Sequence, residues 1–122
     1  MKKWLILFLT IGTLILSACS SDDTGYDTIS LEAVEEKVKE GYIVLDVREV
    51  NEYEQGHIPS AENKPLSILQ QGDFNGLSKE ENYVVICRSG NRSQTASDLL
   101  HKEGFHVVNV SEGMSSWTGP TE

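Results

Sequence analysis

Hydrophobic residues along this chain gather in short runs, each followed by a more polar segment. The runs at 42–47 and 83–86 are nearly continuous and rich in β-branched or aromatic residues, as expected of parallel strands buried on both faces. A further run at 105–110 predicts a last strand, and shorter ones at 28–29 and 61–64 predict two minor strands. The pattern therefore predicts a sheet whose strands are separated by other elements.

Hydrophobic residues at helical spacing occupy the first of these intervals. Leu31, Val34 and Val38 recur at i, i+3 and i+7, which places them on one face of a helix. Ser30 is the expected N-cap, and Gly41 the residue that ends the helix. This stripe predicts a helix that packs against the sheet.

Three further helical segments are predicted. A stripe within 94–104 ends at a glycine, Asn51 caps a single turn over 51–55, and the irregular segment 66–77 contains a short helix. Strands that alternate with helices are typical of a parallel sheet with crossover connections. We therefore predict one α/β domain with a central parallel sheet and helices on both of its faces.

The N-terminal segment has the pattern of an export signal. Lys2 and Lys3 precede an apolar stretch at 4–16, which is shorter than the roughly 20 residues that span a bilayer. The following run, Leu16-Ser17-Ala18-Cys19, resembles the bacterial lipoprotein signal, in which the cysteine is diacylated and becomes the mature N-terminus. An ordinary secretory signal cleaved near Ala18, or an uncleaved anchor, would also export the domain.

This resemblance implies a domain organisation and a location. Residues 1–18 form the signal peptide, residues 19–25 a solvated tether, and residues 26–122 the folded domain. Lipid such as palmitate on Cys19 would attach the domain to the cell membrane, facing the extracytoplasmic side.

Charge narrows the class of partners. The formal net charge is −9, and loss of Lys2 and Lys3 with the signal peptide lowers it to −11. So acidic a domain is poorly suited to nucleic acid or to anionic headgroups. The remaining 104 residues are enough for one small domain, which we expect to be a monomer.

A lone cysteine marks the candidate reactive site. If Cys19 carries lipid, Cys87 is the only thiol left, and no intramolecular disulfide can form. Cys87 ends the strand at 83–86, and ligands bind at that edge of open α/β sheets. The polar run Arg88-Ser89-Gly90-Asn91-Arg92-Ser93 follows and leads into a helix.

Such a loop directs backbone N–H groups at one point, and the helix dipole favours an anion there. Gly90 can adopt the positive φ that wraps the loop, and Arg88 and Arg92 add fixed positive charge. We therefore expect a depressed pKa for Cys87 and a reactive thiolate. Free cysteine is otherwise often a small buried side chain, a role for which this polar surrounding is unsuited.

Three segments of the chain resemble the signatures of rhodanese-type sulfurtransferases. They are, in chain order, Val44–Tyr53 with Gly56–Asn63, Cys87–Ser93, and Val110–Trp117. Together they cover nearly everything after Tyr26. One departure is Glu112-Gly113, where two glycines are common in the family, which affects the local backbone and leaves the nucleophile unchanged.

The resemblance implies a ping-pong sulfur transfer. Cys87 would take sulfane sulfur from a small anionic donor (thiosulfate, a polysulfide or a persulfide) and pass it from a Cys87 persulfide to a thiol or to cyanide. The binding residues would be those of the loop, Arg88, Ser89, Gly90, Asn91, Arg92 and Ser93. Neither an organic cofactor nor a metal is implied.

Other functions stay open at this point. Cysteine phosphatases and arsenate reductases share the architecture, but their loop is one residue longer than the four residues between Cys87 and Arg92. Rhodanese-like folds also serve as non-catalytic interaction modules, usually with the cysteine replaced. A sulfur carrier for another exported protein is a third possibility.

Three polar residues are assigned structural support. Asp46 interrupts a hydrophobic strand, so it must be paired, with Arg48 or with backbone N–H groups of the loop as partner. His57 lies in the turn before Pro59, where its ring is expected to bond locally rather than act as a base. No metal site is expected, because the histidines are scattered and one cysteine cannot form a clustered ligand set.

Overall fold

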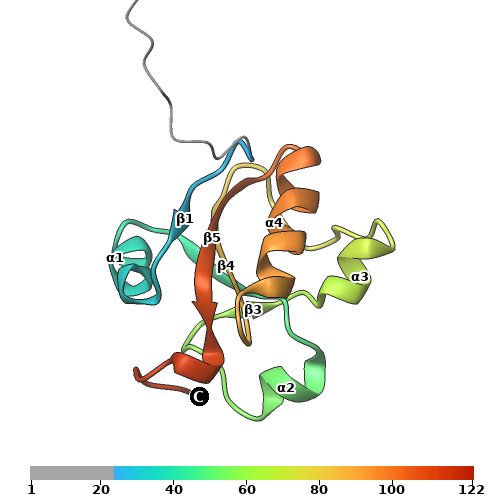
Figure 1. The fold of residues 1–122 in the computed structure, drawn as a ribbon. Coiled ribbons are helices and arrows are strands. Elements are labelled where there is room, and N and C mark those ends of the chain that lie inside the picture. Colours follow the sequence, from blue (N-terminus) through green and yellow to red (C-terminus); the bar gives the residue numbers. More distant parts are fainter. Residues whose placement is uncertain (1–23) are drawn as a thin grey trace, which may run out of the picture.

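A parallel sheet forms the centre of the computed structural model, which describes residues 24–122. The strands are β1 (Thr28–Ile29), β2 (Ile43–Asp46), β3 (Glu62–Asn63), β4 (Asn82–Cys87) and β5 (His106–Gly113). Their spatial order is β1-β5-β4-β2-β3, and every neighbouring pair is parallel (Figure 1). The predicted α/β fold with a central parallel sheet is thus confirmed.

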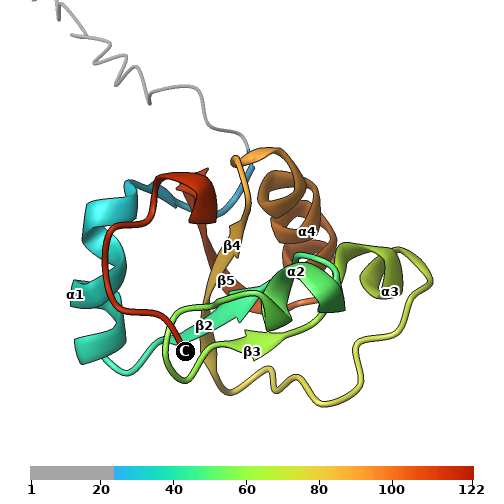
Figure 2. The same cartoon turned by 90° about the horizontal axis from the view of Figure 1, so that it is seen from below.

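Helical segments lie on both faces of the sheet, as predicted. They are η1 (Leu31–Ala33), α1 (Val34–Lys39), α2 (Val50–Glu54), α3 (Leu66–Gln70), α4 (Asn91–Lys102) and η2 (Met114–Ser116). Figure 2 shows α1 on one side of the sheet and α3 with α4 on the other. No helix within residues 24–122 has both the length and the hydrophobicity needed to cross a bilayer.

Two hydrophobic cores follow from the alternation of side chains along the strands. Val84 and Ile86 of β4 pack toward Leu31 and Val34, on the face that α1 covers. The alternate residues, among them Val85 and Cys87, join the core beneath α3 and α4. Cys87 is therefore rooted in a core, with its side chain fully buried.

The predicted helix at 94–104 begins three residues earlier than expected. Helix α4 starts at Asn91, with Gly90 as its N-cap in the left-handed region, at φ 99°. The first turn lacks the hydrophobic residues that mark a helix in the sequence, because it adjoins the Cys87 loop rather than a core. The loop proper is therefore only Arg88 to Gly90, and Gly104 follows the helix as predicted, at φ 95°.

Other boundaries also differ from the prediction. Val38, the last residue of the predicted stripe, is 44% exposed, because the helix is a 3-10 turn followed by a short α-helix. Helix α2 is capped by Glu49, which forms a capping box with Glu52, and Asn51 lies inside the helix. Strand β5 extends to Gly113, three residues beyond the predicted 110.

The extension of β5 brings its backbone against the Cys87 loop. Gly113 pairs with Cys87, and a Cβ on Gly113 would lie 2.2 Å from the Arg88 carbonyl carbon. A Cβ on Gly90 would lie 2.3 Å from the Ser111 carbonyl oxygen. Both neighbours are backbone, which cannot swing aside as a side chain can. Of the two adjacent positions at which Glu112 and Gly113 stand, Gly113 is thus the one where this packing requires a glycine.

We predict that Gly113→Ala lowers the free energy of unfolding by about 2–3 kcal/mol, through overpacking against the Cys87 loop. Gly41→Ala is the control for the added methyl group: nothing lies within 4 Å of a Cβ on Gly41, whose φ is positive (97°), whereas Gly113 is extended (φ −155°) and its Cβ would meet backbone. The cost of Gly41→Ala should be only about 1 kcal/mol, from backbone strain. Urea denaturation of both variants measures the difference. Equal costs would show that the close approach of β5 does not constrain the loop.

Candidate active site

Cys87 lies where β4 ends and α4 begins, at the carboxyl edge of the sheet (Figure 1). The backbone N–H of Gly90 donates a hydrogen bond to Cys87 Sγ, with a nitrogen–sulfur distance of 3.1 Å. The left-handed conformation of Gly90 folds the loop back over the sulfur. The predicted position of the cysteine and the predicted turn at Gly90 are both present.

The environment of Cys87 acts on its pKa in two opposing directions. Burial raises the pKa of the thiol, because desolvation disfavours the thiolate. The hydroxyl of Ser93 and the backbone N–H groups of Ser93, Gly90 and Ser89 lower it by hydrogen bonding to the sulfur. Together these donors outweigh burial, and the pKa of Cys87 lies below its ordinary value.

Ser93 is fully buried beneath the loop. Its Oγ lies 3.1 Å from the Gly90 carbonyl oxygen and 3.3 Å from the Val110 carbonyl oxygen, and its single proton can be donated to one of these oxygens or to the Cys87 sulfur at a time. Ser93 thus links the first turn of α4 to the loop and to β5. The sequence assigned Ser93 to the donor-binding loop, and its contacts place it behind the sulfur. Asn91, by contrast, is exposed at the start of the helix.

The two arginines of the loop have different surroundings. Arg92 donates two hydrogen bonds to Glu52 of α2, at 2.6 Å and 2.9 Å, so its charge is paired. Arg88 is exposed and has no ion pair within residues 24–122. An open depression of about 390 Å³ lies in front of the loop and is lined by Arg48, Glu52, Gln55, Arg88, Met114 and Ser115.

Asp46 and Arg48 form a buried ion pair next to the site. Arg48 Nη2 lies 2.7 Å from Asp46 Oδ2, and Arg48 Nε and its backbone N–H also donate to this carboxylate. Arg48 further donates to the Gly56 carbonyl oxygen at 2.8 Å. Of the two partners considered for Asp46, the structure has Arg48. The pair joins the end of β2 to the turn that holds His57.

His57 contacts its own turn and the distant Glu122, whose carboxylate Oε1 lies 3.7 Å from His57 Nε2. Its Nδ1 lies 2.9 Å from the Tyr53 carbonyl oxygen, and its ring stacks on the Tyr53 ring with a centroid separation of 3.7 Å. Its backbone exchanges two hydrogen bonds with Glu122. These contacts fit the predicted role in holding the turn.

Two residues that contribute to the site were not assigned a role from the sequence. Glu52 lies in a segment with a family signature but was given no role, and its contact with Arg92 spans 40 positions. Ser115 holds the Arg88 carbonyl oxygen, through its backbone N–H at 3.0 Å and its hydroxyl at 2.8 Å. A serine after the last strand carries no pattern that would have indicated this contact.

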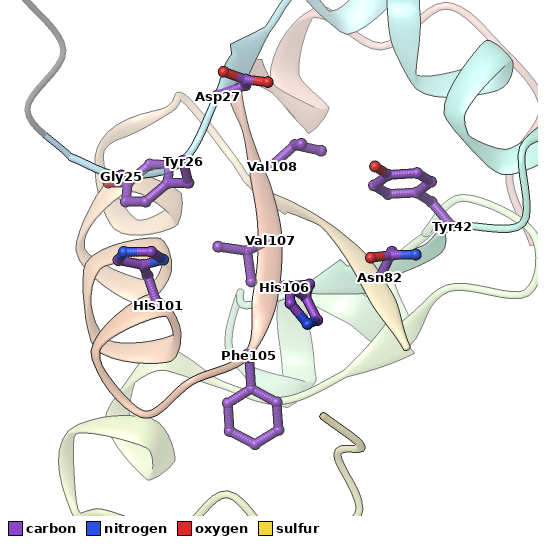
Figure 3. Close-up of a pocket in the computed structure, with 10 residues that line it drawn as sticks. All are labelled: Gly25, Tyr26, Asp27, Tyr42, Asn82, His101, Phe105, His106, Val107 and Val108. Carbon is purple, nitrogen blue, oxygen red and sulfur yellow. The ribbon is translucent and has the colours of Figure 1, made fainter. Parts of the chain in front are cut away.

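A second pocket, of about 270 Å³, opens at the amino edge of the sheet. Figure 3 shows Tyr26 and His101 on one side of β5, with Tyr42 and Asn82 on the other. Asn82 begins β4 and Cys87 ends it, so this pocket lies a strand's length from the sulfur. Residues 24–122 contain no group of three or more His, Cys, Asp or Glu side chains arranged to hold a metal ion.

A family model and several known proteins match this chain over most of its length. The family model described as a rhodanese-like domain matches residues 30–120. A Bacillus subtilis protein named "Putative sulfur carrier protein YrkF" is 42% identical over 106 residues, which are 84% of this chain and 57% of the relative. The chain therefore spans little more than half the length of that protein. A second Bacillus subtilis protein, named "Putative sulfurtransferase YtwF", is 39% identical over 77% of this chain and 92% of its own.

Solved structures support the same assignment. The crystal structure of a rhodanese-related protein from Thermoplasma volcanium superposes with a TM-score of 0.72 at 36% identity. The match covers 80% of this chain and 98% of that one. With its parallel sheet, its Cys87 loop and a family model that spans most of its length, this chain belongs to the rhodanese-like domain family.

Proposed function

We propose that this protein is a sulfurtransferase that carries sulfane sulfur as a persulfide on Cys87. The observation that carries the proposal is the set of loop donors around Cys87 Sγ, which lowers the pKa of the thiol despite its burial. The thiolate is the nucleophilic form of cysteine, and a sulfur stabilised as an anion is equally suited to be a persulfide. Relatives named as sulfurtransferases support this assignment.

In the first step, the Cys87 thiolate attacks the outer sulfur of the donor. With thiosulfate, a bond forms between Cys87 Sγ and the sulfane sulfur, the S–S bond of the donor breaks, and sulfite leaves with the bonding electrons. With a hydropersulfide, the S–S bond of the donor breaks and its inner sulfur leaves as a thiolate, which takes up the proton that the transferred outer sulfur carried and so leaves Cys87 as the persulfide anion. The loop N–H groups stabilise the persulfide anion, and the exposed Arg88 attracts the anionic donor.

In the second step, an acceptor attacks the outer sulfur of the persulfide. Cyanide leaves as thiocyanate, a thiolate leaves as a new persulfide, and in both cases Cys87 is released as the thiolate. Cys87 is fully buried, but an added sulfur extends about 2 Å beyond Sγ. A small acceptor therefore needs to reach the mouth of the loop and not its base.

A sulfur carrier is a second candidate, favoured by the relative named for that role. In that case Cys87 would still gain one sulfur, but only a protein partner would remove it. A rhodanese-like interaction module would gain no sulfur at all. The three roles therefore differ in whether the persulfide forms and in what discharges it.

We also propose that residues 1–18 are a signal peptide, that Cys19 carries lipid and that residues 19–25 tether the domain at 26–122. The Leu16–Cys19 sequence supports this, although residues 1–23 lie outside the described residues. Gly25 packs near His101 at the amino edge of the sheet, and Cys87, the last residue of β4, lies at the opposite edge. A tether attached there would join the domain at the edge of the sheet opposite the Cys87 loop, and so would not cover the loop.

We predict that incubation with thiosulfate or with a small persulfide adds one sulfur to the wild-type protein, as seen in its intact mass. Cyanide or a small thiol should then restore the original mass. Cys87→Ser should gain no sulfur, because a hydroxyl neither ionises readily nor holds a persulfide.

Serine is nearly isosteric with cysteine, so Cys87→Ser should unfold at nearly the same urea concentration as the wild type. If the wild-type protein gains one sulfur but no small acceptor removes it, the sulfur-carrier role is favoured. Transfer by Cys87→Ser, or no gain of sulfur by the wild type with either donor, would contradict the proposal.

For localisation, we predict that full-length protein expressed in a bacterium carries a diacylglycerol-type mass increment on an N-terminal Cys19. Cys19→Ala should lose both the lipid and its recovery with the membrane fraction. The matched control is Cys87→Ser, which should keep both. A mature protein that begins elsewhere, or that carries no lipid, would rule out this anchor.

A further inference from the structure

Glu52, which lines the depression in front of the Cys87 loop, forms an ion pair with Arg92. Helix α2 supplies the carboxylate and the first turn of α4 supplies the guanidinium, with two nitrogen–oxygen distances of 2.6 Å and 2.9 Å. The Arg92 hydrogen bond is the main cause that lowers the pKa of Glu52 from 4.5 to about 2. Glu52 is therefore fully ionised at any pH near neutrality.

The pair is close enough to Cys87 to act on its chemistry. The hydrogen bond from Arg92 to Glu52 is the largest contribution to the raised pKa of Arg92, and the charge of the Cys87 thiolate also contributes. Glu52 itself lines the depression in front of the loop, together with Arg88. A donor that entered this depression would therefore meet the Glu52 carboxylate directly, with its partner Arg92 hydrogen-bonded to it.

The charges around this depression are mostly cancelled. Arg48 is paired with Asp46, and Arg92 is paired with Glu52. That leaves Arg88 as the one arginine of the depression without an ion pair among the described residues. The side chains of Arg92 and Glu52 are 33% and 22% exposed, so water screens their charges only in part.

We propose that Glu52 determines the charge of the donor that the Cys87 site accepts. By cancelling Arg92, it leaves one uncompensated arginine, which suits a donor whose reacting end is neutral or carries a single negative charge, such as a hydropersulfide. Dianionic thiosulfate is disfavoured in comparison. The inference rests on the proposed sulfurtransferase function and narrows its donor class.

A purely structural role for Glu52 makes the opposite prediction. If the carboxylate only held Arg92 in place, its replacement would loosen the loop and slow every reaction at Cys87. Glutamine keeps an oxygen that can accept from Arg92 and removes only the charge. Glu52→Gln should therefore accelerate reactions with anions relative to reactions with neutral reagents.

Alkylation of Cys87 tests this selectivity without requiring sulfur transfer. Iodoacetate and iodoacetamide are nearly the same size and differ by one negative charge, so the ratio of their rate constants measures the field at the sulfur. At low ionic strength we expect Glu52→Gln to raise the iodoacetate-to-iodoacetamide ratio about threefold. Arg92→Gln should lower this ratio, and the double variant should return it close to that of the wild type.

Glu54→Gln is the matched control, because Glu54 lies on the same helix but is exposed and has no ion pair within residues 24–122. It makes the same change in net charge and should leave the ratio unchanged. The variants should change the rates of reaction with anionic sulfur donors in the same directions as they change the alkylation ratio. Glu52→Gln should raise kcat/KM for thiosulfate about tenfold relative to a neutral organic trisulfide.

An unchanged or reduced alkylation ratio in Glu52→Gln would overturn the inference, as would an equal rise in Glu54→Gln. If Glu52→Gln fails to fold, a ratio in Arg92→Gln that does not fall overturns it equally. Absence of sulfur transfer in every variant would contradict the proposed function, while the alkylation ratios would still decide the role of Glu52.

Discussion

The close contact between the Cys87 loop and the end of strand β5 is the constraint on which the site depends. The two backbones approach so closely that neither Gly90 nor Gly113 has room for a Cβ. From β5 and the turn after it, the Val110 carbonyl faces Ser93 and Ser115 binds the Arg88 carbonyl. The loop is therefore fixed from behind, and its N–H groups can converge on the Cys87 sulfur without support from a ligand.

The electrostatics of the site are local, because the chain as a whole is strongly acidic. Its net charge of −9 would repel an anionic substrate. Only hydrogen-bond donors and charges close to the Cys87 sulfur can oppose that field. The leading favourable contributions to the Cys87 thiolate are hydrogen bonds from Ser93, Gly90 and Ser89 rather than the arginines that the sequence emphasised. Arg92 is largely compensated by Glu52, and Arg88 has no ion pair among residues 24–122.

The sequence was sufficient for the features that local patterns encode. Hydrophobic runs located the parallel strands, and the polar run after Cys87 located the loop. The buried Asp46 required a partner, and Arg48 provides it. The pairing of Glu52 with Arg92 could not be read in the same way, because it depends on how two separate helices pack. The early start of α4 was also hidden, since its first turn faces the loop and carries no hydrophobic stripe.

The most direct test of this account is the pKa of Cys87, measured from the ultraviolet absorbance of the thiolate with Cys87→Ser as the blank. Because the loop donors depress the pKa, the thiolate should persist below the titration midpoint of a free thiol, about 8.5, and be lost only as the pH falls through the lower folded-state value. Ser93→Ala should move the midpoint upward. Ser97→Ala, which removes a buried hydroxyl of the same helix that has no hydrogen-bond partner among residues 24–122, should not. A wild-type midpoint at or above that of a free thiol, or one that Ser93→Ala leaves unchanged, would contradict the central role of the loop.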